Sequence, residues 1–338
     1  MATFWYAVLA ALLVAYAVLD GFDLGLGALY LVLARSTGER RIALNAIGPV
    51  WDANEVWLLA VGVALFLAFP RAFAVGFSGF YLPLIIVLWL LMGRGIALEF
   101  RHHIVDPMWQ GAWDVVFSIS SLLLALLFGV AAGNVVTGVP IDERGWFQGL
   151  FTWMLNPYAL IMGAFSLTLL MLHGAHYLRL KTDGALRERA DRAAWRLWGV
   201  VTVLGIVLTA ATFWLRPQLL ANYRAAPAWL LVPFTAAGCV LAIRRAQARR
   251  LDLAAFLASS GLIASLLVAT AVGAYPNLLR SEPFPERSLT IANAAAAPAG
   301  LLAAARWLIP GVILILIYQV VVYRVFKDRV VLDHSAHY

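Results

Sequence analysis

The residues of this sequence that could do chemistry are a few ionisable side chains inside long apolar stretches. Two pairs of acids are each spaced three residues apart, and an arginine and a glutamate close a third stretch; they are Asp20, Asp23, Asp52, Glu55, Arg94 and Glu99. An ionisable group at bilayer depth costs at least ~2.5–3.5 kcal/mol, so it is usually functional. Carboxylates around one arginine can share protons, because burial and neighbouring charge decide which remain ionised. We therefore predict a proton entrance.

A purely structural role competes with this interpretation. Charged side chains near helix ends reach the lipid headgroups, and a buried acid–arginine pair can hold two helices together without any chemistry. The structural role is favoured for Glu55, Asp114 and Arg101. Function is slightly favoured for Asp23, Asp52, Arg94 and Glu99, because three apolar segments contribute them.

The histidines offer little for a haem or a metal ion. His173 and His176 are the only pair within an apolar segment, and no third ligand lies near them in the sequence. His102 and His103 lie in a connection, and His334 and His337 lie in the C-terminal tail. We expect no haem or metal ligated by this chain, and a helix–helix hydrogen bond for the pair. The one cysteine excludes an internal disulfide.

The elements that position these residues are membrane helices. Of the 338 residues, 63% are hydrophobic and 13% charged, whereas a soluble domain has about a quarter charged residues. A spanning helix needs about 20 apolar residues. Cutting at charges and turns gives one all-α membrane domain over residues 1–338, with nine segments: 4–30, 49–70, 77–98, 115–133, 157–178, 194–215, 225–243, 253–274 and 304–326.

The basic residues predict the orientation of these helices. With the N-terminus outside, 18 of the 25 Lys and Arg residues fall in cytoplasmic connections and 7 outside. The C-terminus is then cytoplasmic, and the six ionisable residues lie in the cytoplasmic third of the first three segments. Because the basic residues separate apolar segments and form no soluble basic face, we expect no nucleic-acid partner.

The motifs resemble subunit II of cytochrome bd quinol oxidases. The resemblance covers nearly the whole chain in order, through Asp20–Gly25, Arg40–Leu58, Phe77–Leu82, Arg94–Arg101, Trp113-Asp114, Gly133-Asn134, Leu155–Pro157, His173–Ala175 and Ser288–Ala294. The sequence departs from the family pattern in the alanines of Ala294–Pro298 and in the loop Arg280–Arg287. Neither departure touches the acidic residues.

The resemblance implies a function through a partner. It implies two four-helix bundles plus a peripheral helix, in the bacterial cytoplasmic (inner) membrane, paired with a homologous subunit I. Subunit I would carry two haems b, one haem d and the quinol-oxidising loop, and the complex would reduce dioxygen to water. It also implies a cytoplasmic proton path at Asp23, Asp52, Arg94 and Glu99. Some members add a structural quinone, an oxygen channel or small single-helix subunits, which we carry over to no named residues.

The alternative from another class is a proton-coupled secondary transporter, which intramembrane acids would also suit. A transporter should hold polar substrate contacts at broken helices near the bilayer midplane. The acids here are predicted to lie toward one side instead.

Overall fold

Nine helices are long and apolar enough to cross a membrane in the computed structural model, which describes residues 1–330. The predicted count is confirmed for these residues. The helices are α1 (Ala2–Leu33), α3 (Trp51–Ala68), α5 (Tyr81–Phe100), α6 (Pro107–Thr137), α7 (Pro157–Lys181), α8 (Gly184–Leu215), α10 (Leu231–Ala248, extended by the 3₁₀ turn Pro227–Leu230), α11 (Asp252–Ala274) and α12 (Pro298–Val325).

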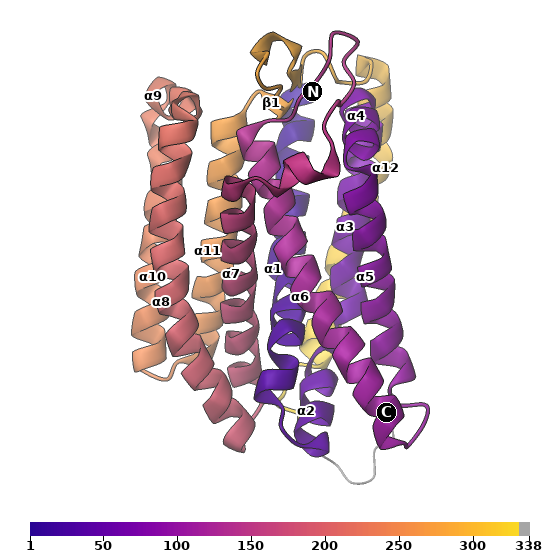
Figure 1. Ribbon diagram of the computed structural model, residues 1–338, viewed down its shortest axis with the longest axis vertical. Coiled ribbons are helices and arrows are strands. Elements are labelled where there is room, and N and C mark those ends of the chain that lie inside the picture. The colour runs from indigo at the N-terminus through magenta and orange to yellow at the C-terminus, as the bar shows by residue number, and fades with distance from the viewer. Residues whose placement is uncertain (331–338) are drawn as a thin grey trace.

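Short elements connect these helices. They are α2 (Thr37–Ile47), α4 (Pro70–Gly79), α9 (Ala221–Ala225), the 3₁₀ turns Phe151–Leu155, Pro217–Leu220 and Pro285–Arg287, and the antiparallel strands β1 (Asn277–Leu279) and β2 (Leu289–Thr290). Figure 1 shows α9 and β1 at the end that holds the N-terminus, here the N end, and α2 at the opposite end, here the α2 end.

Several helices extend beyond the predicted segments. α8 begins at Gly184, well before residue 194, and α6 runs from Pro107 to Thr137 rather than over 115–133. The predicted segments end at charged residues. A helix nevertheless continues through a charged residue whose side chain finds a partner. Arg187, in the first turns of α8, contacts Asp252 of α11 at 2.7 Å. Conversely, the segment predicted at 77–98 is divided, because α4 ends at Gly79 and α5 begins at Tyr81.

The helices can be described as two groups. α1, α3, α5 and α6 pack together, α7, α8, α10 and α11 form the other group, α6 contacts α7 extensively across the groups, and α12 lies beside α3. α1 is the central helix, because it contacts α7 and α11 of the second group as well as its own neighbours (Figure 1).

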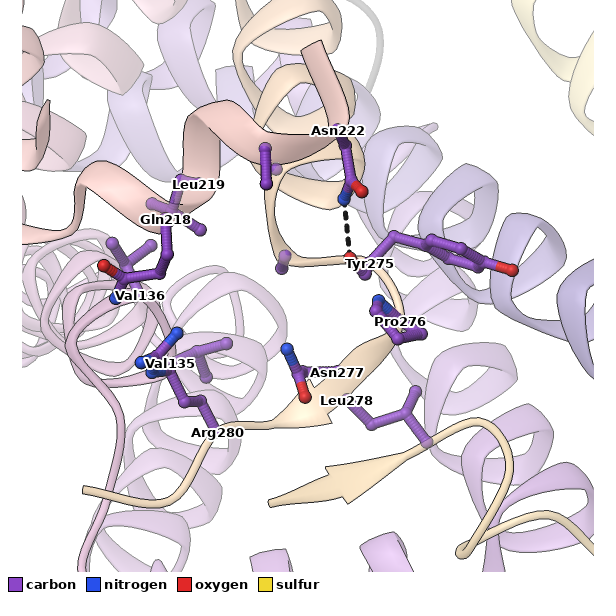
Figure 2. Close-up of a pocket in the computed structure, with 13 residues that line it drawn as sticks. Val135, Val136, Gln218, Leu219, Asn222, Tyr275, Pro276, Asn277, Leu278 and Arg280 are labelled. Carbon is purple, nitrogen blue, oxygen red and sulfur yellow. Dashed lines mark hydrogen bonds between the residues drawn. The ribbon is translucent and has the colours of Figure 1, made fainter. Parts of the chain in front are cut away.

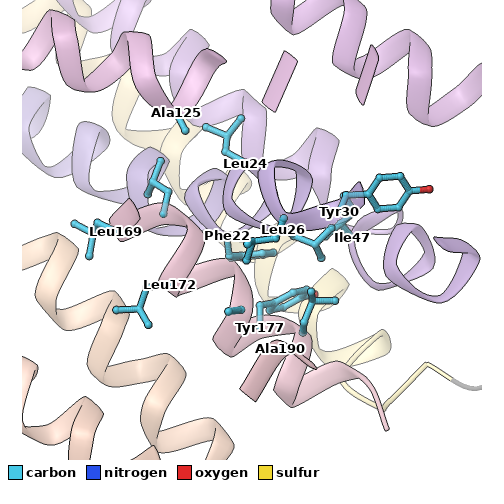
Figure 3. Packing of buried hydrophobic residues seen from close by; sticks show 14 of the residues in the cluster. Phe22, Leu24, Leu26, Tyr30, Ile47, Ala125, Leu169, Leu172, Tyr177 and Ala190 are labelled. Carbon is cyan, nitrogen blue, oxygen red and sulfur yellow. The ribbon is translucent and has the colours of Figure 1, made fainter. Parts of the chain in front are cut away.

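Glycines bring α1 and α7 into backbone contact. A Cβ atom at Gly25 would lie 1.7 Å from the carbonyl oxygen of Leu170, and one at Gly174 would lie 2.2 Å from the nitrogen of Leu26. Small residues allow this approach between membrane helices, as expected for the glycines after Asp20. Beside the contact, the rings of Phe22 and Tyr177 stack with centroids 4.0 Å apart (Figure 3). The seam between α1 and α7 is therefore closely packed.

Candidate functional site

The centre of the predicted site is a buried ion pair between α1 and α5. Arg94 donates from Nη1 to Oδ2 of Asp20 at 2.9 Å, and from Nη2 to Oδ1 of the same carboxylate. Both residues are fully buried. A bidentate arginine–carboxylate pair is among the stronger charge-assisted contacts. Arg94 thus balances the charge of the Asp20 carboxylate and fixes its orientation.

Asp23 lies one turn further along α1 in a different environment. Its Oδ2 accepts a hydrogen bond of 2.8 Å from Nδ2 of Asn54 on α3. Its Oδ1 has no partner among residues 1–330, although the side chain is fully buried. Buried polar atoms without a partner are rare in proteins, so each one needs an explanation. Asp23 is therefore the buried acid of this site with one oxygen that no described residue binds.

The other three predicted residues lie at the edge of this buried centre. Asp52 lies in the first turn of α3 and is exposed, Glu99 is exposed near the end of α5, and Glu55 is half-buried. The structure thus brings together Asp20, Asp23 and Arg94, and leaves the remaining acids outside direct contact. From the α2 end inward, acids pass from exposed to half-buried to fully buried.

Sequence reasoning missed a set of neutral polar residues around Asp23. The Oδ1 atom of Asn54 accepts hydrogen bonds from Nε2 of Gln319 at 2.6 Å and from the Tyr323 hydroxyl at 3.0 Å, both on α12. On α1, the hydroxyl of Tyr16 is buried one turn from Asp20 and has no partner within residues 1–330. Gln319 and Tyr323 are four residues apart in an apolar helix, so they share one face. That spacing was visible in the sequence.

A second charged cluster joins α1, α2, α5 and α6 around Asp114. Oδ1 of Asp114 accepts from the Tyr30 hydroxyl at 2.5 Å and from Nε of Arg101 at 2.5 Å, and Oδ2 accepts from Nη1 of Arg40 at 2.9 Å. Every carboxylate oxygen has a donor from another element. This geometry suits the structural role that the sequence favoured for Asp114 and Arg101.

The two histidines within α7 differ. His173 uses both ring nitrogens, Nδ1 at 2.7 Å from Oγ of Ser259 on α11 and Nε2 at 3.0 Å from the carbonyl oxygen of Val18 on α1. It makes the expected helix–helix hydrogen bond. His176 does not, because both of its buried nitrogens lack partners in the described part of the chain.

The remaining histidines add no ligand set. In the loop after α5, burial and the neighbouring Arg101 and Arg41 hold the pKa of His102 below its usual value. His334 and His337 lie outside the described residues. Within residues 1–330, three or more side chains that could hold a metal ion do not come together.

A cavity of about 250 Å³ lies at the N end, far from the acids. Figure 2 shows it between the end of α6, the turn Pro217–Leu220 and the segment around Tyr275, with Gln218, Asn277 and Arg280 on its wall. Asn222 closes one side by donating to the Tyr275 carbonyl oxygen at 2.6 Å. The wall is otherwise mainly apolar.

Comparison with known proteins identifies the family. The model of cytochrome bd terminal oxidase subunit II matches residues 1–326. This chain belongs to that family. This chain is similar to the probable cytochrome oxidase subunit 2 of Haemophilus influenzae, with 36% identity over 84% of this chain and 83% of that protein. It is also similar to the cytochrome bd-I ubiquinol oxidase subunit 2 of Escherichia coli K12, with 34% identity over 86% and 84% of the two chains.

The fold comparison agrees. The structure matches the bd oxidase from Geobacillus thermodenitrificans with a TM-score of 0.78 and 21% identity, over 96% of this chain and 98% of that chain. The protein is therefore a membrane subunit of a quinol:oxygen oxidoreductase of the bacterial inner membrane, and its family implies a subunit I partner. The transporter alternative is set aside.

Proposed function

We propose that this subunit II ligates no haem, acts as the scaffold for subunit I, and forms part of the path by which cytoplasmic protons reach the site of dioxygen reduction. The observation that carries the proposal is the buried Asp23 with an unpartnered oxygen, next to the neutralised Asp20. Subunit I would hold the two haems b and the haem d. The structural quinone and the small single-helix subunits stay predictions.

The proposed orientation places the α2 end in the cytoplasm and the N-terminus outside. The excess of Lys and Arg in the connections at the α2 end supports it, because cytoplasmic connections carry that excess. In this orientation Asp52 and Glu99 face the cytoplasmic side, where protons enter.

The chemistry of the path follows from the gradation of burial. Asp52 and Glu99 collect protons at the surface, and Glu55 lies one turn of α3 beyond Asp52. Asp23 accepts the proton inside, because its nearest donor, the amide of Asn54, is neutral and leaves Oδ1 available. The Arg94 guanidinium balances the charge of Asp20, so the site carries no second unbalanced carboxylate. Gln319 and Tyr323 are neutral and donate to Asn54. They orient the Asn54 amide and do not take up the proton themselves.

The donor set within this chain supports placing the haems in the partner. Both ring nitrogens of His173 form hydrogen bonds, one with Ser259 and one with the carbonyl oxygen of Val18. A haem held by two histidines needs a histidine nitrogen without such a bond on each of two helices. His176 shares α7 with His173. When bound in subunit I, the haems would supply the electron transfer and oxygen chemistry, and this chain would supply protons.

The test compares oxygen consumption by purified complexes that carry Asp23→Asn or Asp52→Asn. General proton transfer by a positioned group contributes roughly 10²–10⁴-fold, so we expect at least a tenfold slower turnover with unchanged haem d absorbance. Glu188→Gln is the matched control, because Glu188 is an exposed acid of α8 outside this site. Oxygen consumption equal to the wild type would overturn the proton path. Loss of assembled complex in both variants would instead assign these acids to helix packing.

A further inference from the structure

A second cavity opens at the α2 end, separate from the Asp20 site. It has a volume of about 370 Å³ and lies between the start of α2, the loop after α5 and the first turns of α6. Its wall includes four charged residues, namely Arg40, Arg101, Asp106 and Asp114. The proposed proton path uses none of them.

The positive and the negative charges of the wall lie in different parts of the cavity. On the floor, two guanidinium groups share the single carboxylate of Asp114, which leaves one positive charge in excess. Arg40 carries this excess toward the opening, because its side chain is 31% exposed whereas that of Arg101 is 4% exposed. Asp106 lies exposed at the start of α6, where its Oδ1 caps the helix by accepting from the Trp109 nitrogen at 2.8 Å. The wall as a whole is neutral, with a cation inside and an anion at its edge.

Neutral donors accompany the arginine. Thr37 and Gln110 also line the cavity, and neither side chain makes a hydrogen bond to any of residues 1–330. A hydroxyl, an amide and an arginine are the groups that bind phosphate oxygens. The ligand that matches this wall carries a phosphate and, a short distance away, a positive charge.

The surroundings of the cavity are apolar. Val105 is 94% exposed and Met108 is 83% exposed, on either side of Asp106 and Pro107. Trp109 donates from Nε1 to the Phe100 carbonyl oxygen at 2.9 Å and packs edge-on against Trp113. Tryptophans of this kind mark the headgroup level of a membrane. Exposed apolar side chains next to that level favour a lipid over a free phosphate as the ligand.

We propose that this cavity binds the headgroup of a phospholipid with a phosphate and a primary amine, of the phosphatidylethanolamine type, in the leaflet at the α2 end. Arg40, Thr37 and Gln110 bind the phosphate, and Asp106 accepts from the ammonium. Val105 and Met108 contact the acyl chains. Basic pockets between helices on one side of a membrane are known to bind lipid headgroups; here the added carboxylate selects a zwitterion. The bound lipid would tie α2 to the start of α6.

The experiment uses the whole complex, purified and stripped of loosely held lipid, and native mass spectrometry after addition of phosphatidylethanolamine, phosphatidylglycerol or phosphatidylcholine. Variants are compared with the wild type, so that lipids bound elsewhere cancel. We expect the wild type to retain one more phosphatidylethanolamine than Arg40→Gln, with at least tenfold weaker binding in that variant. Arg35→Gln, an exposed arginine before α2, is the control and should bind as the wild type does.

A second variant keeps the fold intact. Asp106→Asn preserves a good N-cap but removes the negative charge, so it should lose the preference for phosphatidylethanolamine over phosphatidylglycerol without changing haem d absorbance. Inorganic phosphate at millimolar concentration should not displace the lipid. Equal retention of the three lipids by the wild type, unchanged retention in both variants, or displacement by inorganic phosphate would each overturn the proposal. If Arg40→Gln fails to assemble, Asp106→Asn decides alone.

Discussion

At the scale of single residues, the two buried acids of α1 have different surroundings because their partners differ. Asp20 faces a cation that binds both of its oxygens, whereas Asp23 faces a neutral amide that binds one. Asp20 thus stabilises Arg94 in the apolar interior, and Asp23 keeps one oxygen without a partner among residues 1–330. Residues three apart in the sequence therefore differ in their contacts because α3 and α5 present different side chains to them.

We predict that Asp20→Asn destabilises the subunit strongly. It leaves Arg94 as a buried charge without its partner, a change that costs about 3–5 kcal/mol. The yield of assembled complex and its thermal midpoint, followed by haem d absorbance, should both fall. Adding Arg94→Met to the same chain should recover most of the stability, because the unpaired charge is then gone. A double variant as unstable as the single one would contradict this account.

At the scale of elements, the contact between α1 and α7 depends on glycines that no other residue can replace. We predict that Gly25→Ala abolishes assembly, because the added methyl would lie 1.7 Å from the Leu170 carbonyl oxygen. Gly199→Ala in α8 is the control, since a Cβ atom there meets nothing within 4 Å and alanine favours the helix. The readout is the amount of complex extracted from membranes. Normal assembly of Gly25→Ala would show that the two helices can separate.

The helices were predictable from the sequence because apolar length and charge spacing report directly on membrane crossing. Their ends were less predictable, since Arg187 continues α8 through a contact with Asp252 that lies 65 residues away. The buried site was predictable in part, because charged residues are rare in the apolar segments. The acids stand out against an apolar background, but the pairing of Asp20 with Arg94, rather than Asp23, depends on how α1 and α5 are rotated. Gln319 and Tyr323 contact Asn54 only through tertiary structure.

At the scale of the whole molecule, polar contacts at the α2 end join the two helix groups. Arg189 of α8 donates to the Leu33 carbonyl oxygen at 2.7 Å and pairs with Glu39 of α2 at 2.5 Å. Beyond α12, Val330 donates to the Lys181 carbonyl oxygen at 2.9 Å, and Nζ of Lys181 donates to the carbonyl oxygens of Phe326 and Asp328. The residues 326–330 therefore connect α12 to the α7–α8 corner.

The Glu39–Arg189 pair predicts a pH dependence of stability. The hydrogen bond from Arg189 holds the pKa of Glu39 below its usual value of 4.5. A lowered carboxyl pKa gives stability that is present above pH 4.5 and is lost as the pH falls through the lower value. We expect Glu39→Gln to lower the thermal midpoint slightly at neutral pH, by well under ~1 kcal/mol, and to have no effect below that value. Calorimetry of both proteins across this range tests it, and a difference that persists in acid would argue against the pair.

We predict that Lys181→Met loosens the connection between α12 and the second helix group. The variant keeps the apolar stem of Lys181 but removes the donor to Phe326 and Asp328. Limited proteolysis of the purified complex should then cleave after residue 325 several times faster than in the wild type, whereas Lys327→Met, an exposed neighbour, should leave the rate unchanged. Equal cleavage of the two variants would show that Lys181 does not hold the segment.

The position of α12 also has a consequence for how the protein is made. Trp5 of the first helix donates to the Leu301 carbonyl oxygen, and Asn54 accepts from Gln319 and Tyr323. During synthesis, the first three helices therefore enter the membrane with polar groups that find these partners only after α12 has followed them. A chain interrupted before α12 would leave Asn54 and the Trp5 indole without these hydrogen bonds.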